Sequence, residues 1–241
     1  MRQFIADASH ELRTPLTTIR GFAELYRQGA ARQPEETAGL LRRIEDEAAR
    51  MGLLVEDLLL LARMDRERPI ALAPVELPVL ASDAVQAARA VEPDRAITLE
   101  IEPGAGPLVV LGDDARLRQV IGNLMTNALT HTPDGSPISV RISTGLQEGR
   151  PPVPCAVLEV TDHGPGLTEE QASRVFERFY RADQARGRRT GGSGLGLAIV
   201  AALVTAHGGT VGVDTAPHQG ATFRITLPLA PEALATESAA D

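Results

Sequence analysis

The chain has 241 residues, 43% of them hydrophobic, so it can build one or two domains with real cores. Its formal net charge of -8 argues against a general nucleic-acid-binding protein, because such a protein needs a dominant basic surface. All 24 basic residues are Arg, and the absence of Lys excludes a Walker-type phosphate loop, a catalytic Lys and Schiff-base chemistry. The single Cys155 cannot form an intramolecular disulfide.

The first predicted helix carries apolar or helix-compatible residues in alternating steps of three and four: Ile5, Ala8, Leu12, Pro15, Ile19, Phe22 and Tyr26. This spacing is typical of the seam of a bundled helix. With the seam at heptad positions a and d, His10 falls at position f, the outermost point of the helix, next to Glu11. An imidazole held in solvent beside a carboxylate is available for chemistry, although a lone surface His more often has no role.

A second helix is predicted after the break at residues 29–36, with its own seam at Leu41, Ile44, Ala48, Met51, Val55, Leu58 and Ala62. Two such helices joined by a short loop form an antiparallel hairpin. The hairpin leaves apolar surface on each helix, which favours a homodimer with a four-helix bundle. Docking of the hairpin on the rest of the chain is the alternative.

The sequence contains no run of about 18 uncharged apolar residues, so none of it is expected to span a bilayer. The heptad pattern is already present at Ile5, with no capping residue ahead of it. We therefore expect the native helix to begin further upstream and this chain to be the cytosolic part of a longer protein.

Composition divides the chain into a helical module at residues 1–67, a Pro-containing linker at 68–78, a second module at 79–230 and a disordered tail at 231–241. The second module mixes helices, predicted at 79–90, 114–130 and 195–206, with strands, predicted at 97–101, 108–111, 138–143, 156–161, 210–213 and 221–227. Helices on one face of a mixed sheet form an α/β sandwich. The fold class is therefore α+β, a helical hairpin followed by this sandwich.

Four motifs of the second module have spacing that suits chemistry. Asn123, Asn127 and His131 are four residues apart and share one helix face, where neutral amides can orient a magnesium ion beside phosphates. Asp162-His163-Gly164-Pro165-Gly166 follows a strand, so Asp162 can accept from an exocyclic amine while the glycines let a flat ring approach. Taken alone, both patterns also occur on ordinary polar surfaces.

The other two motifs lie further along the chain. Phe176-Glu177-Arg178-Phe179-Tyr180-Arg181 leads into a basic run, 186–190, which is expected to close over a polyphosphate as a lid. Gly191-Gly192-Ser193-Gly194-Leu195-Gly196 opens a helix, where bared backbone amides and the positive helix end provide a phosphate seat. The glycine spacing does not fit the dinucleotide-binding pattern G-x-G-x-x-G.

Five segments in this order resemble the H, N, G1, F and G2 boxes of bacterial sensor histidine kinases: HELRTP at 10–15, NLMTNALTHTP at 123–133, DHGPG at 162–166, FERFYR at 176–181 and GGSGLGLAI at 191–199. The resemblance covers residues 4–229. It implies a dimerisation and phosphotransfer hairpin followed by an ATP-binding domain of the Bergerat type. The order of all five boxes makes it far more specific than any one of them.

The resemblance also assigns roles. His10 is expected to be the phosphoacceptor, Glu11 the adjacent general base, and Thr14 the residue that orients water for dephosphorylation of the partner. Asn127 is expected to be the magnesium ligand and Asp162 the acceptor for adenine. Further nucleotide-binding residues are expected at Asn123, His131, Gly164, Gly166, Arg178, Arg181, Gly192, Gly194, Leu195 and Gly196. Many relatives have Lys where this chain has Thr130, so a phosphate contact is lost or supplied by one of the arginines.

The expected reaction is autophosphorylation of His10 by ATP with Mg2+, followed by transfer to an aspartate of a cognate response regulator, with regulator phosphatase activity as well. The expected partners are a second copy of the chain and the regulator, without nucleic acid. The membrane is expected to be reached only through a segment absent from this chain, the parent protein being a cell-membrane sensor. The rival functions are a Bergerat-fold ATPase and a scaffold without histidine phosphorylation.

Overall fold

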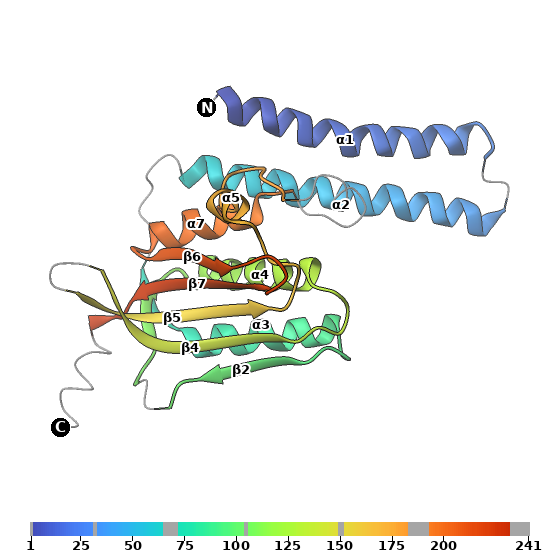
Figure 1. The fold of residues 1–241 in the computed structure, drawn as a ribbon. Coiled ribbons are helices and arrows are strands. Elements are labelled where there is room, and N and C mark those ends of the chain that lie inside the picture. Colours follow the sequence, from blue (N-terminus) through green and yellow to red (C-terminus); the bar gives the residue numbers. More distant parts are fainter. Residues whose placement is uncertain are drawn as a thin grey trace. The chain divides into compact units, whose positions relative to one another are not determined.

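A computed structural model describes residues 2–30, 33–64, 72–103, 106–148, 152–182 and 193–231, with side chains from residue 6 onward. The chain divides into two compact units, Met1–Glu67 and Arg68–Asp241, and each has its own fold (Figure 1). The tail predicted to be disordered lies, from residue 232 onward, outside the described residues.

The first unit is a hairpin of two helices, α1 (Arg2–Arg27) and α2 (Pro34–Met64), which contact each other along their length (Figure 1). Gly29 ends α1 in the left-handed conformation, with φ of 75°. Its N–H donates to the Tyr26 carbonyl over 3.0 Å, and the N–H of Ala30 donates to the Leu25 carbonyl over 3.0 Å, the pattern of a Schellman motif. The predicted helical hairpin is therefore confirmed.

The apolar seam of the hairpin is only partly covered within one copy of the chain. On α1, Pro15 is buried, and on α2 the most buried residues are Leu54 and Leu61, at 6% and 0% exposure. By contrast, Leu41 and Val55, which belong to the predicted seam of α2, remain 50% and 41% exposed, whereas Leu54 and Leu61 lie outside that predicted seam. One hairpin covers each helix on one side only, so apolar side chains stay in contact with solvent.

The second unit contains a five-stranded sheet in the order β2-β4-β5-β7-β6, of which β2 and β4 are parallel and the other neighbours antiparallel. Its strands are β2 (Ile97–Ile101), β4 (Ile138–Gln147), β5 (Val153–Asp162), β6 (Thr210–Thr215) and β7 (Ala221–Pro228). The helices are α3 (Leu77–Val91), α4 (Asp114–His131), α5 (Glu169–Arg174) and α7 (Gly196–Ala206). Figure 1 shows α3 and α4 on one side of the sheet.

Residues 73–78 belong to the second unit, so the predicted linker at 68–78 is wrong over this part. β1 (Ala73–Glu76) pairs with β3 (Val109–Gly112) in a separate two-stranded ladder, and α3 begins directly after it. The prolines that suggested a linker are compatible with both elements. Pro74 lies in a strand with only one partner, and Pro78 lies in the first turn of α3, where its missing N–H is not needed.

The two faces of the large sheet differ in polarity. Residues that point toward the helices form the core, among them Val140, Leu158 and Phe223, all at 2% exposure or less. On the other face, Arg141 pairs with Glu100 over 3.3 Å and Arg224 pairs with Glu159 over 2.8 Å. Charges that alternate from strand to strand keep this face in water, so the helices that the structure describes pack on the opposite face.

Candidate functional site

The first group of candidate residues lies on α1. His10 is exposed, Glu11 beside it is half-buried, and Thr14 is exposed one turn further along. The hydroxyl of Thr14 donates to the main-chain carbonyl of His10 over 3.4 Å, so both side chains lie on the same side of the helix. The chemistry available here is that of an imidazole in solvent with a carboxylate and a hydroxyl within one turn.

The second group follows one face of α4. Asn123 and Asn127 are half-buried and His131 is exposed, whereas the opposite face is buried through Leu117, Val120, Ile121, Leu124, Met125 and Ala128. The burial of that opposite face fixes which side of α4 meets solvent. The helix is held at its N-terminus by Asp113, whose carboxylate accepts from the N–H of Arg116 over 3.2 Å.

The end of β5 provides the third group. Asp162 is 6% exposed, and its Oδ1 accepts from the N–H of Gly164 over 2.8 Å. Burial raises the pKa of the Asp162 carboxyl, and the backbone N–H groups of Gly164 and Ala221 oppose this shift. A carboxylate has about four acceptor positions, so this buried group can accept from a ligand N–H in addition to the two backbone N–H groups.

The glycines of this turn are required by close approaches. A Cβ on Gly164 would lie 2.9 Å from the carbonyl oxygen of His131, so the turn packs directly on the last turn of α4. Gly166 has φ of 66°, and a Cβ there would overlap the Ala216 carbonyl. The sequence motif therefore places its glycines where backbone from other elements excludes any side chain.

The structure adds residues from the β6–β7 hairpin that the motifs did not indicate. The hydroxyl of Thr215 accepts from the N–H of Leu167 over 3.0 Å and donates to the carbonyl of Gly220 over 2.7 Å. The N–H of His218 donates to the carbonyl of Pro165 over 2.7 Å. Gly220 lies against the Asp162 carbonyl with φ of 75°. The only signal in the sequence was a Gly between two strands, which predicts a turn and not its contacts.

The fourth group joins the segment after α5 to the start of α7. Phe179 has φ of 64°, and its N–H donates to the carbonyl of Gly194 over 2.9 Å. Arg178 is exposed and Arg181 half-buried. Leu195 is fully buried and immediately precedes α7. The predicted lid at 186–190 and the candidate Gly192 lie outside the described residues.

Three contacts bring the motifs of the second unit together. His131 meets Gly164, Phe179 meets Gly194, and the amide of Asn123 donates to the Gly196 carbonyl over 3.2 Å. This arrangement offers a buried acceptor, a face of neutral amides and a helix N-terminus with bared amides, which are the groups needed to hold a nucleotide.

The residues of this site can bind magnesium only together with a bound nucleotide. Among the residues that the structure describes, no three His, Cys, Asp or Glu residues are grouped so that they could hold a metal ion. The carbonyl oxygen of Asn127 is a hard ligand of the kind magnesium prefers, and phosphate oxygens of a bound nucleotide would have to supply the charged ligands. The residues thus fit a metal that arrives with a nucleotide.

Comparison with known proteins decides the family. Residues 1–67 match the model of the His Kinase A (phospho-acceptor) domain, and residues 112–231 match that of the Histidine kinase-, DNA gyrase B-, and HSP90-like ATPase. The solved structure of the mycobacterial sensor histidine kinase MprB is 31% identical in sequence to this chain, and the TM-score is 0.54. The matched region covers 97% of the MprB structure and 65% of this chain. The chain belongs to the sensor histidine kinase family. The predicted family and fold class are confirmed.

Longer relatives in this kinase family match nearly the whole chain. The probable sensor histidine kinase TcrY of Mycobacterium tuberculosis is 48% identical over 95% of this chain and 46% of its own length. The structure of full-length ShkA in complex with AMPPNP is 30% identical, with a TM-score of 0.66 over 95% of this chain and 46% of ShkA. The chain spans less than half the length of TcrY and of the sensor histidine kinase TrcS of Mycobacterium tuberculosis. No helix among the described residues has the length and hydropathy needed to span a membrane.

Proposed function

We propose that the chain transfers the γ-phosphoryl group of ATP to His10 and then passes it to an aspartate of a response regulator. The observation that carries this proposal is the combination of two units in one chain. One presents an exposed imidazole beside a carboxylate on α1, and the other holds a buried acid, amides and a helix N-terminus together.

Asp162 selects the base in this proposal. Its carboxylate already takes the N–H of Gly164 and has further acceptor capacity for the exocyclic amine of adenine. Gly164 and Gly166 permit the tight turn that holds this carboxylate in place, because backbone carbonyls occupy the space where side chains would lie. The N-terminus of α7, beginning at Gly196, faces the phosphates with its free N–H groups and positive dipole end.

Phosphoryl transfer uses the residues of α1. An imidazole nitrogen of His10 attacks the γ-phosphorus, a P–N bond forms, the bond to the β-phosphate oxygen breaks, and ADP leaves. The N–H proton of the ring goes to the carboxylate of Glu11. Magnesium held through Asn127 would offset charge on the phosphate oxygens when it is bound. Arg178 and Arg181 are candidates for the phosphate contact that Thr130 cannot make.

We assign the dephosphorylation of the response regulator to Thr14. Its hydroxyl is exposed and lies one turn from His10, where it can orient a water molecule against the phosphoaspartate of a docked regulator. Thr14→Ala should therefore preserve labelling of His10 and abolish dephosphorylation of the regulator.

Val55 and Leu41 support a homodimer through the hairpin, because they are apolar and exposed in one copy. We also propose that the parent protein is a membrane sensor with this part in the cytosol, since TcrY is named a probable sensor histidine kinase and the chain spans 46% of its length.

The deciding experiment is incubation of the full chain with γ-labelled ATP and magnesium. The parent should acquire a label that is acid-labile and base-stable, whereas His10→Gln and Asn127→Ala should acquire none above background. His218→Asn is a matched control, because it removes an exposed imidazole, keeps the main-chain N–H that donates to Pro165, and Asn tolerates its φ of 65°. A label that persists on His10→Gln, or ATP hydrolysis without any labelled protein, would overturn the proposal and favour a Bergerat-fold ATPase.

A further inference from the structure

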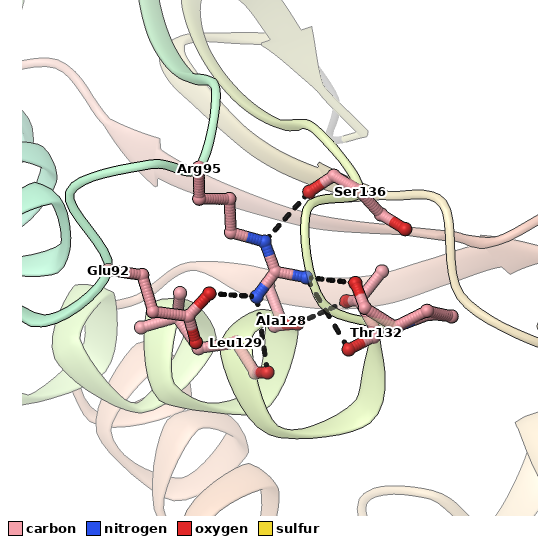
Figure 2. A network of polar contacts seen from close by, with 7 residues as sticks. Glu92, Arg95, Ala128, Leu129, Thr132 and Ser136 are labelled. Atoms are coloured by element: carbon pink, nitrogen blue, oxygen red, sulfur yellow. Dashed lines mark hydrogen bonds and ion pairs between the residues drawn. The ribbon is translucent and has the colours of Figure 1, made fainter.

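Arg95 is the one buried arginine among the described residues of the second unit. It lies in the turn between α3 and β2, and its side chain is 1% exposed. A guanidinium removed from water requires acceptors for all of its N–H groups, since an unpaired buried charge is strongly destabilising. Figure 2 shows that Arg95 has these acceptors on several sides of its fork.

The five N–H groups of Arg95 have five acceptors. Nη1 donates to Glu92 over 2.8 Å and to the Leu129 carbonyl over 3.3 Å (Figure 2). Nη2 donates to the carbonyls of Thr132 and Pro133 over 3.4 and 2.9 Å. Nε donates to the Ser136 carbonyl over 2.7 Å. The side chain is therefore fully paired, and four of its five partners are main-chain carbonyls.

Those carbonyls belong to the C-terminal end of α4 and the loop after it. The last four carbonyls of a helix have no partner within the helix, and no glycine follows α4 directly to provide the usual cap. Arg95 takes over this role together with Thr132, whose hydroxyl donates to the Ala128 carbonyl. A cation at this end also complements the negative pole of the helix dipole.

The same end of α4 forms a wall of the nucleotide site. The His131 carbonyl, between two carbonyls held by Arg95, stands against Gly164, whose N–H is bonded to Asp162. A shift of the last turn of α4 would therefore displace the turn that aims Asp162 at the base. All five N–H groups of Arg95 are taken by the carbonyls and Glu92 named above, so it makes no hydrogen bond to Asn123 or Asn127.

We propose that Arg95 is a positioning residue for adenine recognition. It fixes the end of α4 so that His131 and Gly164 hold the Asp162 carboxylate in the orientation that distinguishes adenine from other bases. This role rests on the proposed function, because it requires a nucleotide bound at Asp162. It differs from general stabilisation, because its loss should change which base is preferred and not only how stable the fold is.

The test compares ADP with IDP, measured on the full chain without magnesium so that the metal does not contribute. Hypoxanthine has a carbonyl where adenine has its amine, so a correctly aimed Asp162 carboxylate attracts ADP and repels IDP. The parent should prefer ADP. In Arg95→Met the ratio of the two dissociation constants should fall about tenfold, a change of about 1.4 kcal/mol.

Arg89→Met is the matched control. Arg89 is exposed, but it too donates to a main-chain carbonyl, that of Ile97, over 3.0 and 2.6 Å, and it makes this bond to β2 and not to α4. Its loss should lower the urea midpoint and leave the ratio of ADP to IDP affinity within about twofold of the parent. Arg95→Lys keeps the charge with a single nitrogen and should recover part of the preference.

Urea unfolding of each variant shows whether a change in nucleotide affinity reflects loss of the fold or loss of base preference. If Arg95→Met does not fold, the ratio of ADP to IDP affinity is measured on Arg95→Lys and Glu92→Gln instead. Glu92 is 32% exposed, and the Gln amide at this position preserves the shape of the contact with Arg95. A folded Arg95 variant that loses affinity for ADP and IDP equally, or keeps the parental ratio, overturns the inference. A parent chain that does not bind ADP overturns the proposed function itself.

Discussion

The side-chain amide of Asn123 donates a hydrogen bond to the main-chain carbonyl of Gly196 over 3.2 Å. These residues are 73 positions apart in the sequence and belong to different motifs, one on α4 and the other at the first residue of α7. The bond sets the amide face of one helix against the N-terminus of the other. Asn123 thus has a structural partner in addition to the nucleotide contact expected from the sequence.

Asn123→Ala should lower the free energy of unfolding by about 1 kcal/mol, the usual net worth of one hydrogen bond, and should also weaken ATP binding. The second effect arises because α7 would no longer be fixed relative to Asn127. Urea denaturation and equilibrium binding measure the two quantities. Thr126→Ala, an exposed position on the same helix, is the control. Equal ATP affinity in the parent and Asn123→Ala would show that the bond does not position the site.

Asp162→Asn should stabilise the protein without nucleotide at neutral pH while weakening ADP binding about tenfold. The two effects have one cause. The carboxylate is 6% exposed, so its charge is costly in the absence of a ligand, yet in the proposed function its charged oxygen accepts from the amine of adenine. Measurements of thermal midpoint and ADP affinity on the same samples test this opposition, and a variant that is both less stable and unimpaired in binding would contradict it.

The stability gain should depend on pH in a defined direction. Because burial raises the pKa of Asp162 in the folded protein, the folded state binds more protons than the unfolded state between the two pKa values. The contribution of this group to the free energy of unfolding therefore decreases as the pH rises through that window. The difference in stability between Asp162→Asn and the parent should increase from acid to neutral pH and then level off. Urea midpoints across this range provide the measurement.

Local pattern predicted most helices and strands of the second unit, because burial on one face sets the periodicity of each element, but it missed the short helix α5 and strand β1. Strand β5 and helix α4 have the predicted type at the predicted place. The ladder of β1 was missed because Pro74 is permitted in a strand with one partner, and no local signal distinguishes that strand from a linker.

The candidate site was predictable only in part, for a similar physical reason. Asp162, Gly164 and Gly166 were identified because a turn and a close approach demand particular residue types. Arg95 was not, since its function depends on carbonyls 34 to 41 residues away that only the folded chain brings together. Every residue carries a main-chain carbonyl, so the sequence does not show which carbonyls will accept from Arg95.

Gly166 and Gly122 differ in the space available for a Cβ atom and in backbone conformation, so replacing each with Ala should change the stability in opposite directions. Gly166→Ala should cost at least about 1 kcal/mol of stability, since Ala is strained at its φ of 66° and the new methyl group would meet the Ala216 carbonyl. Gly122→Ala, inside α4 with nothing within 4 Å of the added Cβ, should instead stabilise by about 0.5–1 kcal/mol. Urea unfolding measures both. A Gly166→Ala variant as stable as the parent would mean that the turn relaxes freely.

In the proposed homodimer, Val55→Glu should separate the two copies of the chain into monomers. Val55 lies at a seam position of α2 and is 41% exposed in one copy, so a second hairpin is needed to cover it. A carboxylate buried in that seam without a partner would cost more than the lost apolar contact. Light scattering should show the mass falling from twice that of the chain to that of one chain.

The control for this change is Leu53→Glu on the same helix. Leu53 is 65% exposed but falls at heptad position f, which points away from the seam, so the same charge there should leave the dimer intact. Comparison of the two variants separates loss of the interface from a general effect of added charge, because both change the net charge by the same amount. If Leu53→Glu dissociates the dimer and Val55→Glu does not, the hairpins pair through a different face, and the heptad assignment of α2 is wrong.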